Sequence, residues 1–373
     1  MVKPFNPDKF RKGITKALPG VAAGFYDPTD WISTGNYVLN YLISGDFHKG
    51  IPLGKVTCFA GESGAGKSYI AAGNLVRHAQ EQGIFVVLLD SENALDEKWL
   101  HAIGVDTSED KLLRIGVSMV DEVARTLSEF VKGYESDYGH LDPEERPKVL
   151  MVVDSLGMLL TPTDSDQFER GDMKGDLGRK AKSLTALVRN AVNRIAKWNI
   201  GFVATNHTYA SQDMFDPDDK ISGGQGFIYA SSIVIAMKKL KLKLDDQGNK
   251  VSNVRGIRAG CKVMKSRYAK PFESVKVNIP YDSGMDPYSG MFEMLMDMEI
   301  LEKQGNRYKY VSPVDGEEIL LFQKAWGRND NGCLDRIMEE FSKVKKNANY
   351  NIDDHAEEIE EIEVTEEPET TEE

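Results

Sequence analysis

A glycine-rich loop that ends in lysine and serine is the part of this sequence best suited to chemistry. It reads Gly61-Glu62-Ser63-Gly64-Ala65-Gly66-Lys67-Ser68 and matches the pattern G-x-x-x-x-G-K-[ST]. A strand-like apolar run precedes it and a helix-like run follows. In that setting backbone N–H groups surround phosphate oxygens, Lys67 reaches the terminal phosphates and Ser68 offers a hydroxyl to Mg²⁺. The loop therefore predicts binding of a nucleoside triphosphate, against the alternative of a glycine turn that binds nothing.

A second candidate group follows another apolar run. The segment Val149–Asp154 predicts a buried strand that ends in an acid. In phosphate-loop ATPases a carboxylate at the end of a neighbouring strand helps to hold Mg²⁺. Asp154 is accordingly the predicted metal-binding partner of Ser68.

Composition restricts the class of protein. The chain has 373 residues, 41% of them hydrophobic, and no apolar run long enough to span a membrane. The segment Met1–Phe10 has no apolar signal-peptide stretch. Three widely spaced cysteines argue for a reducing compartment and against a zinc cluster or a disulfide framework. These features predict a cytoplasmic enzyme.

The net charge of −13 is concentrated at one end of the sequence. Residues 353–373 carry twelve of the 59 carboxylates and no Lys or Arg, which leaves 47 acidic against 46 basic side chains elsewhere. Such a composition predicts a disordered acidic tail that either tunes access to nucleic acid or serves only solubility. The nearly neutral remainder neither supports nor excludes a nucleic-acid partner.

Strand and helix patterns alternate through the centre of the chain. Four strand candidates are separated by helical patterns, and three more follow each other with short polar turns; in order they are Val56–Ala60, Ile84–Asp90, Val149–Asp154, Gly201–Asn206, Ile233–Leu244, Ile257–Lys265 and Val275–Pro280. This order predicts an α/β fold with a mainly parallel sheet, helices on both faces and an antiparallel extension.

The segment Arg179–Trp198 predicts an amphipathic helix. Its apolar stripe comprises Leu184, Leu187, Val188, Ala191, Ile195 and Trp198. The same segment carries six cations and no acid. Those cations form either a solvated polar face or, at the N-terminal end of the helix, a surface that faces phosphates.

The order of further motifs resembles that of RecA-family recombinases over about 33–290. The motifs that carry the resemblance are Ser33-Thr34-Gly35, Leu89-Asp90-Ser91-Glu92-Asn93-Ala94-Leu95-Asp96, Val153-Asp154-Ser155-Leu156-Gly157, Ala204-Thr205-Asn206-His207, Gly223-Gly224 and Val263-Met264-Lys265-Ser266-Arg267. The forms Asn206-His207-Thr208-Tyr209, Lys265-Ser266-Arg267 and Asp286-Pro287-Tyr288-Ser289-Gly290 resemble the UvsX-like recombinases of T-even-type bacteriophages more than the bacterial enzyme. The resemblance implies a RecA-like phosphate-loop ATPase core.

The resemblance also implies roles for residues of the ATP site. Glu92 would orient the attacking water, although it could instead be an exposed loop acid. His207 would sense the γ-phosphate, against the alternative of a structural histidine. Trp99 would stack on adenine while Asp96 accepts from its amino group, unless Trp99 is a core residue. Lys265 and Arg267 share one face of a strand and would reach the ATP of a neighbouring subunit.

Two long segments, 161–178 and 209–226, follow inner strands of the predicted sheet, and we expect them to be loops. In the family such loops hold DNA. The residues nominated for that role are Met173, Lys174, Gly175, Arg179, Lys180, Phe215, Lys220, Gly223 and Gly224. Acidic residues outnumber basic ones in both segments. The stretch after Gly223-Gly224 is also one residue shorter than in the bacterial pattern.

The sequence thus predicts a DNA-dependent ATPase that forms filaments on single-stranded DNA and exchanges strands with duplex DNA. ATP and Mg²⁺ would be its cofactors. Its partners would be both forms of DNA, further copies of itself, a recombination mediator and a single-stranded-DNA-binding protein, in the cytoplasm of a bacterial host and without a membrane. The alternatives are a RecA-fold ring ATPase, helicase-like or KaiC-like, and a small-molecule kinase that shares only the phosphate loop.

Four regions are predicted from these patterns. They are a protomer-contact arm, a RecA-like ATPase and DNA-binding core, a small C-terminal α/β region and a disordered acidic tail, at 1–32, 33–285, 286–346 and 347–373 respectively.

Overall fold

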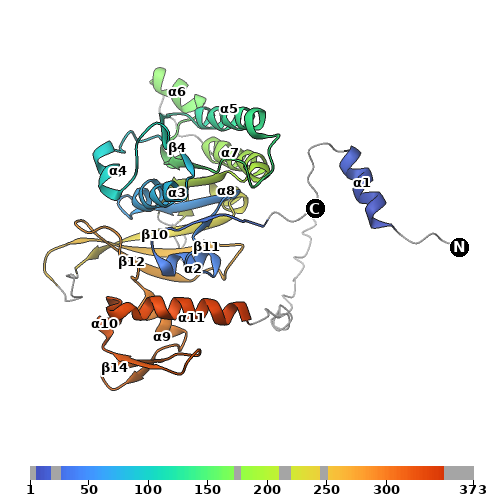
Figure 1. Ribbon diagram of the computed structural model, residues 1–373. Coiled ribbons are helices and arrows are strands. Elements are labelled where there is room, and N and C mark those ends of the chain that lie inside the picture. The colour runs from blue at the N-terminus through green and yellow to red at the C-terminus, as the bar shows by residue number, and fades with distance from the viewer. Residues whose placement is uncertain (1–5, 18–26, 172–177, 210–219, 244–250, 348–373) are drawn as a thin grey trace, which may run out of the picture.

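A sheet of eight strands lies between two layers of helices, and a smaller α/β piece follows it along the chain (Figure 1). The computed structural model describes residues 6–17, 27–171, 178–209, 220–243 and 251–347. Six neighbouring strands are parallel, in the spatial order β10 (Ile233–Leu242), β3 (Val56–Gly61), β7 (Gly201–Asn206), β6 (Val149–Asp154), β4 (Phe85–Asp90) and β5 (Leu112–Gly116). The predicted parallel core is confirmed.

The edge strand β5 was not predicted. Its sequence, Leu112-Leu113-Arg114-Ile115-Gly116, is a short apolar run interrupted by a charge, and only Leu112 is buried. β5 completes one edge by pairing in parallel with β4.

The antiparallel extension is also confirmed. β10 (Ile233–Leu242) pairs in parallel with β3, and β11 (Gly256–Lys265) and β12 (Ser274–Pro280) follow it in antiparallel pairs. β11 therefore runs opposite to the strand that carries the phosphate loop.

Two hydrophobic clusters fix the helices on the faces of the sheet. One face is covered by α2 (Tyr37–Ser44), the π-helix η1 (Tyr69–Asn74), α3 (Leu75–Glu81) and α4 (Glu97–Ile103). The other is covered by α5 (Val120–Tyr138), α7 (Arg179–Ile195) and α8 (Gly224–Ala230). All six residues of the predicted stripe on 179–198 are buried, and the helix ends in the 3₁₀ turn η3 (Ala196–Trp198).

The first predicted loop is partly wrong. Within 161–178 the chain forms helix α6 (Pro162–Glu169), which begins with a capping box. The Thr161 side chain accepts a hydrogen bond from Asp164 N, and the Asp164 carboxylate accepts one from Thr161 N. Asp164 therefore satisfies the backbone N–H group of Thr161 at the start of the helix.

Two small ladders and a 3₁₀ turn join the larger elements. β1 (Trp31–Ile32) pairs with β2 (Ile51–Pro52), so these two residues of the predicted arm belong to the folded body. β8 (Thr208–Tyr209) pairs with β9 (Lys220–Ile221) within the second predicted loop. The 3₁₀ turn η2 (Leu156–Met158) follows β6.

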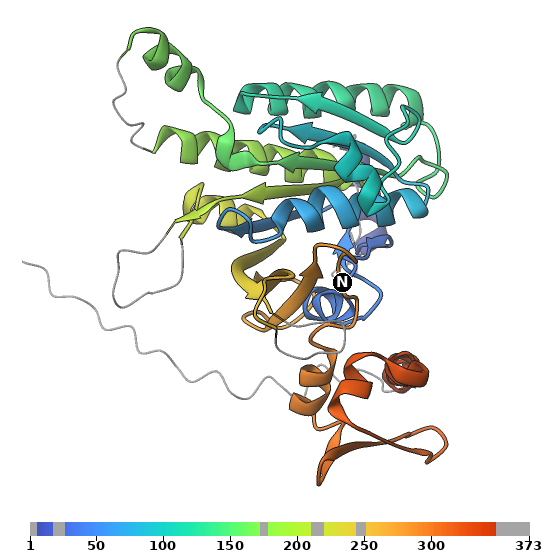
Figure 2. The same ribbon diagram turned by 90° about the vertical axis from the view of Figure 1, so that its left-hand side faces the viewer.

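The C-terminal piece packs beyond α2, away from α5 (Figure 2). Its elements are α9 (Met291–Asp297), β13 (Glu302–Gln304), β14 (Arg307–Val311), β15 (Glu318–Leu321), α10 (Gln323–Gly327), η4 (Asp330–Gly332) and α11 (Cys333–Asn347). Trp326 is completely buried there, and its Nε1–H donates to Tyr308 O at 3.1 Å. The core of this piece joins the cluster that lies under α2.

The N-terminal helix α1 (Pro7–Ala17) lies apart from the sheet (Figure 1). Its Ile14 side chain is exposed. Among the described residues, no helix is both long and apolar enough to cross a membrane.

Cys58 lies within β3 and is completely buried. Burial raises the pKa of its thiol to about 12, so the thiolate does not form near neutral pH. Cys58 is therefore a buried, inert thiol.

Asn36 connects two motifs that are 250 residues apart in the sequence. Its Oδ1 accepts a hydrogen bond from Leu39 N at 2.8 Å and caps α2. Its Nδ2 donates to the carbonyl oxygens of Asp286, Pro287 and Ser289 at 3.0–3.2 Å. One side chain thus satisfies a helix end and a distant turn.

We expect Asn36→Ala to lower the free energy of unfolding by about 3 kcal/mol, because it removes a helix cap and the side-chain hydrogen bonds to three carbonyl oxygens of the distant turn. Urea unfolding followed by circular dichroism measures the change. Asn190→Ala is the control, since this exposed residue donates only to Ala186 O on the surface of α7. An equal loss in both variants would contradict the proposed role of Asn36.

Candidate active site

The predicted ATP-site groups meet at one edge of the sheet. Because β3, β4, β6 and β7 are parallel, their carboxyl ends share that edge. The phosphate loop, Glu92, Asp154 and His207 follow these four strands in turn. The structure therefore brings together groups that lie up to 146 positions apart in the chain.

The phosphate loop is held in shape by glycine conformations and by its own lysine. Gly64 and Gly66 have φ of +75° and +93°, a region that favours glycine. Lys67 Nζ donates to Gly61 O at 2.9 Å and to Glu62 O at 2.8 Å. Burial lowers the pKa of Lys67, against the opposing effect of the nearby carboxylates Asp154, Glu92 and Glu62. The loop thus presents one buried cation at the edge of the sheet.

The two predicted metal-binding groups lie side by side. The Ser68 hydroxyl donates to the Asp154 carboxylate, and Thr205 Oγ1 donates to Asp154 Oδ1. Burial raises the pKa of Asp154, while these two hydroxyls act in the opposite direction. Among the described residues there is no cluster of three or more His, Cys, Asp or Glu that could hold a metal. The donor set suits Mg²⁺, which binds through one or two protein groups together with phosphates and water.

Asp90 holds the segment that carries Glu92. Its carboxylate accepts hydrogen bonds from Glu92 N at 3.2 Å and from Leu95 N at 3.4 Å. Arg114 Nη2 on β5 donates to Asp90 Oδ2 at 2.6 Å and neutralises this buried charge. The unpredicted edge strand therefore fixes the position of Glu92.

Glu92 and His207 lie at the same point of the site. His207 Nε2 is 3.5 Å from Glu92 Oε1, and Ser155 Oγ lies between them. Gly157 makes the approach of the imidazole possible, because a Cβ on Gly157 would lie only 2.2 Å from His207 Cδ2. The His207 position is thus built by close packing against the turn that follows β6.

Asp96 and Trp99 lie at the start of α4. Asp96 Oδ1 accepts a hydrogen bond from Trp99 N at 3.1 Å and caps the helix. Trp99 is partly buried and makes an edge contact with Tyr69, with ring centroids 6.3 Å apart. A hollow of about 690 Å³ opens beside it and is also lined by Tyr281 and Met285. Trp99 therefore packs on the core and also faces this hollow, whose lining includes Tyr69 but no residue of the phosphate loop.

Lys265 and Arg267 lie toward the amino ends of the parallel strands, whereas the phosphate loop lies at their carboxyl ends. Lys265 pairs with Val234, which lies opposite Cys58, whereas the start of the phosphate loop lies opposite Met237. Three strand steps separate the two levels, or about 10 Å at a rise of about 3.3 Å per residue. Arg267 lies in the bend after β11, near enough to Lys55 at the start of β3 to lower the pKa of that lysine, so the prediction that both cations share one strand is wrong. Neither cation is placed to reach the phosphate loop of its own chain.

The ammonium group of Lys265 is fully engaged within the protomer. Its Nζ donates to the carbonyl oxygens of Ile228, Tyr229 and Ser231 at 3.1, 2.8 and 2.7 Å, at the C-terminal end of α8. Burial and the neighbouring Arg267 lower the pKa of Lys265, and both also lower the pKa of Lys55 at the start of β3. Lys55 is a third cation at this edge that the sequence reading did not single out.

The nominated DNA-contact residues are only partly described. Met173, Lys174, Gly175 and Phe215 lie outside the described residues. Arg179 is exposed and its Nη1 lies 3.5 Å from Thr163 Oγ1, whereas Lys180 Nζ donates to Gly157 O at 2.6 Å.

The second nominated segment is described from Lys220 onward. Lys220 pairs with Tyr209 in the short ladder, and Gly223 and Gly224 have φ of +97° and +70° at the start of α8. Each segment thus rejoins the described part of the chain close to the ATP-site groups. The first does so at Lys180, which contacts Gly157, and the second at Lys220, which pairs with Tyr209 just after His207.

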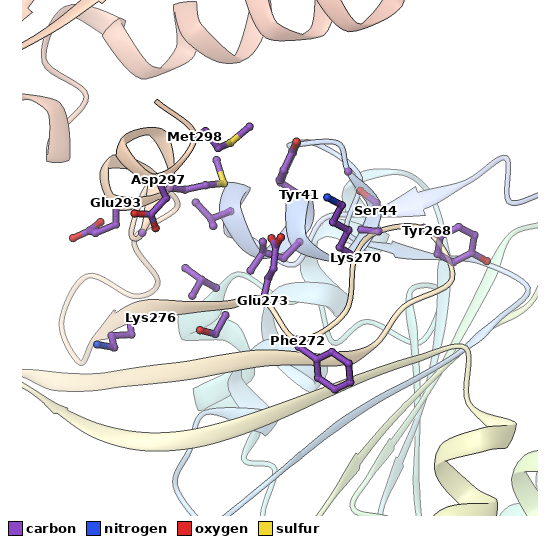
Figure 3. Close-up of a pocket in the computed structure, with 18 of the residues that line it drawn as sticks. Tyr41, Ser44, Tyr268, Lys270, Phe272, Glu273, Lys276, Glu293, Asp297 and Met298 are labelled. Atoms are coloured by element: carbon purple, nitrogen blue, oxygen red, sulfur yellow. The ribbon is translucent and has the colours of Figure 1, made fainter. Parts of the chain in front are cut away.

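A larger hollow, of about 1130 Å³, lies elsewhere, between α2, α9 and the loop that joins β11 to β12. Figure 3 shows Glu293 and Asp297 of α9 on one side of it and Lys270 and Tyr268 of the loop on the other. Its lining has mixed charge and includes no residue of the phosphate loop. Size therefore does not identify the chemical site, and the convergence of strand ends does.

Sequence reasoning gave no role to several residues that build the site. Ser155, Gly157 and Thr205 stand inside motifs that were recognised, but only their contacts reveal what they do. Asp90 was likewise read only as part of a motif. Arg114 belongs to a strand without a clear sequence signal.

Comparisons with known proteins agree with this geometry. The family described as RecA N-terminal domain matches residues 24–286. A "Recombination and repair protein" of Enterobacteria phage T4 is 26% identical over 316 residues, which cover 84% of this chain and 75% of the relative. A "Protein RecA" of Clostridioides difficile is 27% identical over 332 residues, which cover 88% of this chain and 86% of the relative.

We expect Thr205→Val to move the pH dependence of Mg²⁺ binding upward. Asp154 would bind Mg²⁺ as a carboxylate, so binding would be lost as the pH falls through its raised pKa. Without the Thr205 hydroxyl that pKa rises further, and the loss begins at a higher pH. The measurement is the Mg²⁺ concentration for half-maximal binding of a fluorescent ATP analogue at a series of pH values.

Thr57→Val is the matched control. Thr57 is equally buried on the adjacent strand, and its hydroxyl has no hydrogen-bond partner among the described residues. A pH profile that moves equally in both variants, or downward in Thr205→Val, would contradict the assignment.

Proposed function

The chain belongs to the RecA family, and we propose from that premise that it is a DNA recombination and repair protein driven by ATP. It would polymerise on single-stranded DNA and pair that strand with homologous duplex, in the cytoplasm of a bacterial host. The observation that carries the proposal is the sharing of one sheet edge by the phosphate loop, Glu92, Asp154 and His207. No observation on the described residues favours the ring ATPase.

The ATP site would work through groups that are already in place. Lys67 would exchange its two carbonyl contacts for β- and γ-phosphate oxygens, which restore the hydrogen bonds of the buried ammonium. Ser68 and Asp154 would hold Mg²⁺, which neutralises phosphate charge when bound. Glu92, fixed through Asp90, would orient the attacking water.

The adenine would lie against Trp99 at the start of α4. The indole would supply an apolar face, and the Asp96 oxygen that does not cap α4 would accept from the adenine amino group. His207 would donate to the γ-phosphate, since its Nε2 already points toward Glu92.

The site would be completed by a neighbouring protomer. Lys265 and Arg267 lie toward the edge opposite the phosphate loop, so a phosphate within their reach belongs to another molecule. Lys265 must exchange the three α8 carbonyls for phosphate oxygens when it engages that neighbour. The arm at 1–32, with Ile14 exposed on α1, would add a second contact between protomers. Hydrolysis would then require assembly.

DNA would lie against the two segments that follow β6 and β7. Backbone N–H groups, the exposed Arg179 and the Gly223-Gly224 turn would contact the sugar-phosphate chain, and base pairing would supply the sequence specificity. The segments 172–177 and 210–219, which hold the other nominated residues, would contribute as well. The acidic tail at 347–373, a mediator and a single-stranded-DNA-binding protein would regulate access to DNA.

We expect single-stranded DNA to raise ATP turnover by about 5- to 150-fold, the usual range of coupling between two ligands. A phosphate-release assay measures turnover. Negative-stain images with DNA and a non-hydrolysable ATP analogue should show filaments, and Lys67→Ala should abolish both effects. Turnover that ignores DNA, or closed rings in place of filaments, would contradict the proposal.

A mixing experiment tests the shared site. Glu92→Gln destroys the cis half of each interface, and the double variant Lys265→Ala/Arg267→Ala destroys the trans half. Each protein alone should lose about 100-fold or more of the DNA-stimulated turnover. An equal mixture should recover about a quarter of the parent rate, because random head-to-tail assembly unites the two intact halves at that fraction of interfaces.

Recovery no greater than the sum of the two separate proteins would place all of these residues in one protomer. Parent-like turnover by Lys265→Ala/Arg267→Ala alone would show that these two cations do not belong to the ATP site.

A further inference from the structure

The turn that follows β6 is a meeting point for both nominated DNA segments and the nucleotide site. Lys180, just after the first segment, donates from Nζ to Gly157 O at 2.6 Å. His207, just before the second, packs on Gly157 and accepts at its carbonyl oxygen from Ser222 N at 3.0 Å. A displacement of either segment therefore acts on the same three-residue stretch, Ser155–Gly157.

Ser155 occupies the centre of this stretch. Its side chain is completely buried, and its Oγ donates to Glu92 Oε1 at 2.9 Å. The same oxygen lies 3.3 Å from His207 Nε2. A reciprocal pair of bonds with Ser91 fixes its backbone, since Ser155 N donates to Ser91 Oγ at 2.8 Å and Ser91 Oγ donates to Ser155 O at 2.7 Å.

The hydroxyl has a single proton, and this limits what the three side chains can do together. While Ser155 donates to Glu92 it can only accept from His207, so Nε2 must carry a hydrogen in this arrangement. That N–H is shared between Ser155 Oγ and Glu92 Oε1, at 3.3 and 3.5 Å. If the imidazole turns toward a phosphate, Glu92 loses its contact with His207. Of these three side chains, only Ser155 then donates to the Glu92 carboxylate.

We propose that Ser155 is a positioning residue that couples His207 to Glu92. It holds the Glu92 carboxylate in one orientation and transmits to it the position of the His207 ring, which both DNA segments control. The proposal rests on the proposed function for the roles of Glu92 and His207. It adds the element through which bound DNA would change the orientation of the water-activating carboxylate.

The test is a double-mutant cycle of Ser155→Ala and His207→Ala, measured as ATP turnover with and without single-stranded DNA. Ser155→Ala should lower the DNA-stimulated kcat about tenfold, as expected for lost orientation of a catalytic group, and leave the KM for ATP unchanged. In the His207→Ala background the same substitution should lower kcat by clearly less than tenfold, because only the direct bond from Ser155 to Glu92 is then lost and no coupling to the ring remains. Additive losses would overturn the proposal.

Ser155→Cys separates the hydrogen bond from the shape of the side chain. Cysteine fills nearly the same space but is a weak donor, so this variant should fall almost as far as Ser155→Ala. Full parent activity in Ser155→Cys would show that only packing matters and would overturn the coupling. Ser289→Ala removes another buried serine hydroxyl, which donates to Asp286 O at 2.9 Å far from this turn, and should leave kcat unchanged.

The outcomes for the inference and for the proposed function are distinct. A parent protein whose turnover ignores DNA overturns the proposed function. The cycle is then decided on turnover without DNA, where non-additive effects of Ser155→Ala and His207→Ala support the coupling and additive effects overturn it.

Discussion

The directions of β10 and β11 decide what one protomer can do by itself. β10 runs parallel to the strand of the phosphate loop, and β11 turns back beside it, so Lys265 and Arg267 lie toward the far edge of the sheet. A side chain at the amino ends of the parallel strands does not reach phosphates at their carboxyl ends, which are about 10 Å away along the strands. The complete set of catalytic charges that we propose would therefore need a second copy, which head-to-tail assembly would supply.

Buried charge is the second constraint, because each ionised group at the site needs a partner when no phosphate is bound. Lys67 uses carbonyls of its own loop, Asp90 uses Arg114, and Asp154 uses the hydroxyls of Ser68 and Thr205. For Lys67 and Ser68 these partners are ones that a triphosphate with Mg²⁺ would replace. The apo protomer thus keeps its binding groups oriented and satisfied, which reduces the cost of ordering them when the ligand enters.

Sequence reasoning succeeds where chemistry is carried by contiguous residues at the ends of apolar strands. The phosphate loop, the acid of β6, the parallel core and the antiparallel extension all follow from such local patterns. It fails where structure depends on contacts between distant segments. β5 is short, carries a charge in its middle and is fixed by pairing with β4 and by the bond from Arg114 to Asp90, while α6 begins in a capping box that could be read only as a cluster of acids. The role of Asn36 is invisible in the sequence, because its partners lie 250 positions away.

Helix α8 lies between the second nominated DNA segment and Lys265, because each of its two ends contacts one of them. Its N-terminus follows the second DNA segment at Gly223, and the carbonyls near its C-terminus are held by Lys265. A lysine that leaves those carbonyls for a neighbour's phosphate removes a charge from the end of α8, where the helix dipole favours a cation. Completion of the proposed shared site would therefore weaken the anchor of the nominated DNA segment. Together with the Ser155–Gly157 turn, α8 would then connect nucleotide and DNA elements at both ends of the parallel strands.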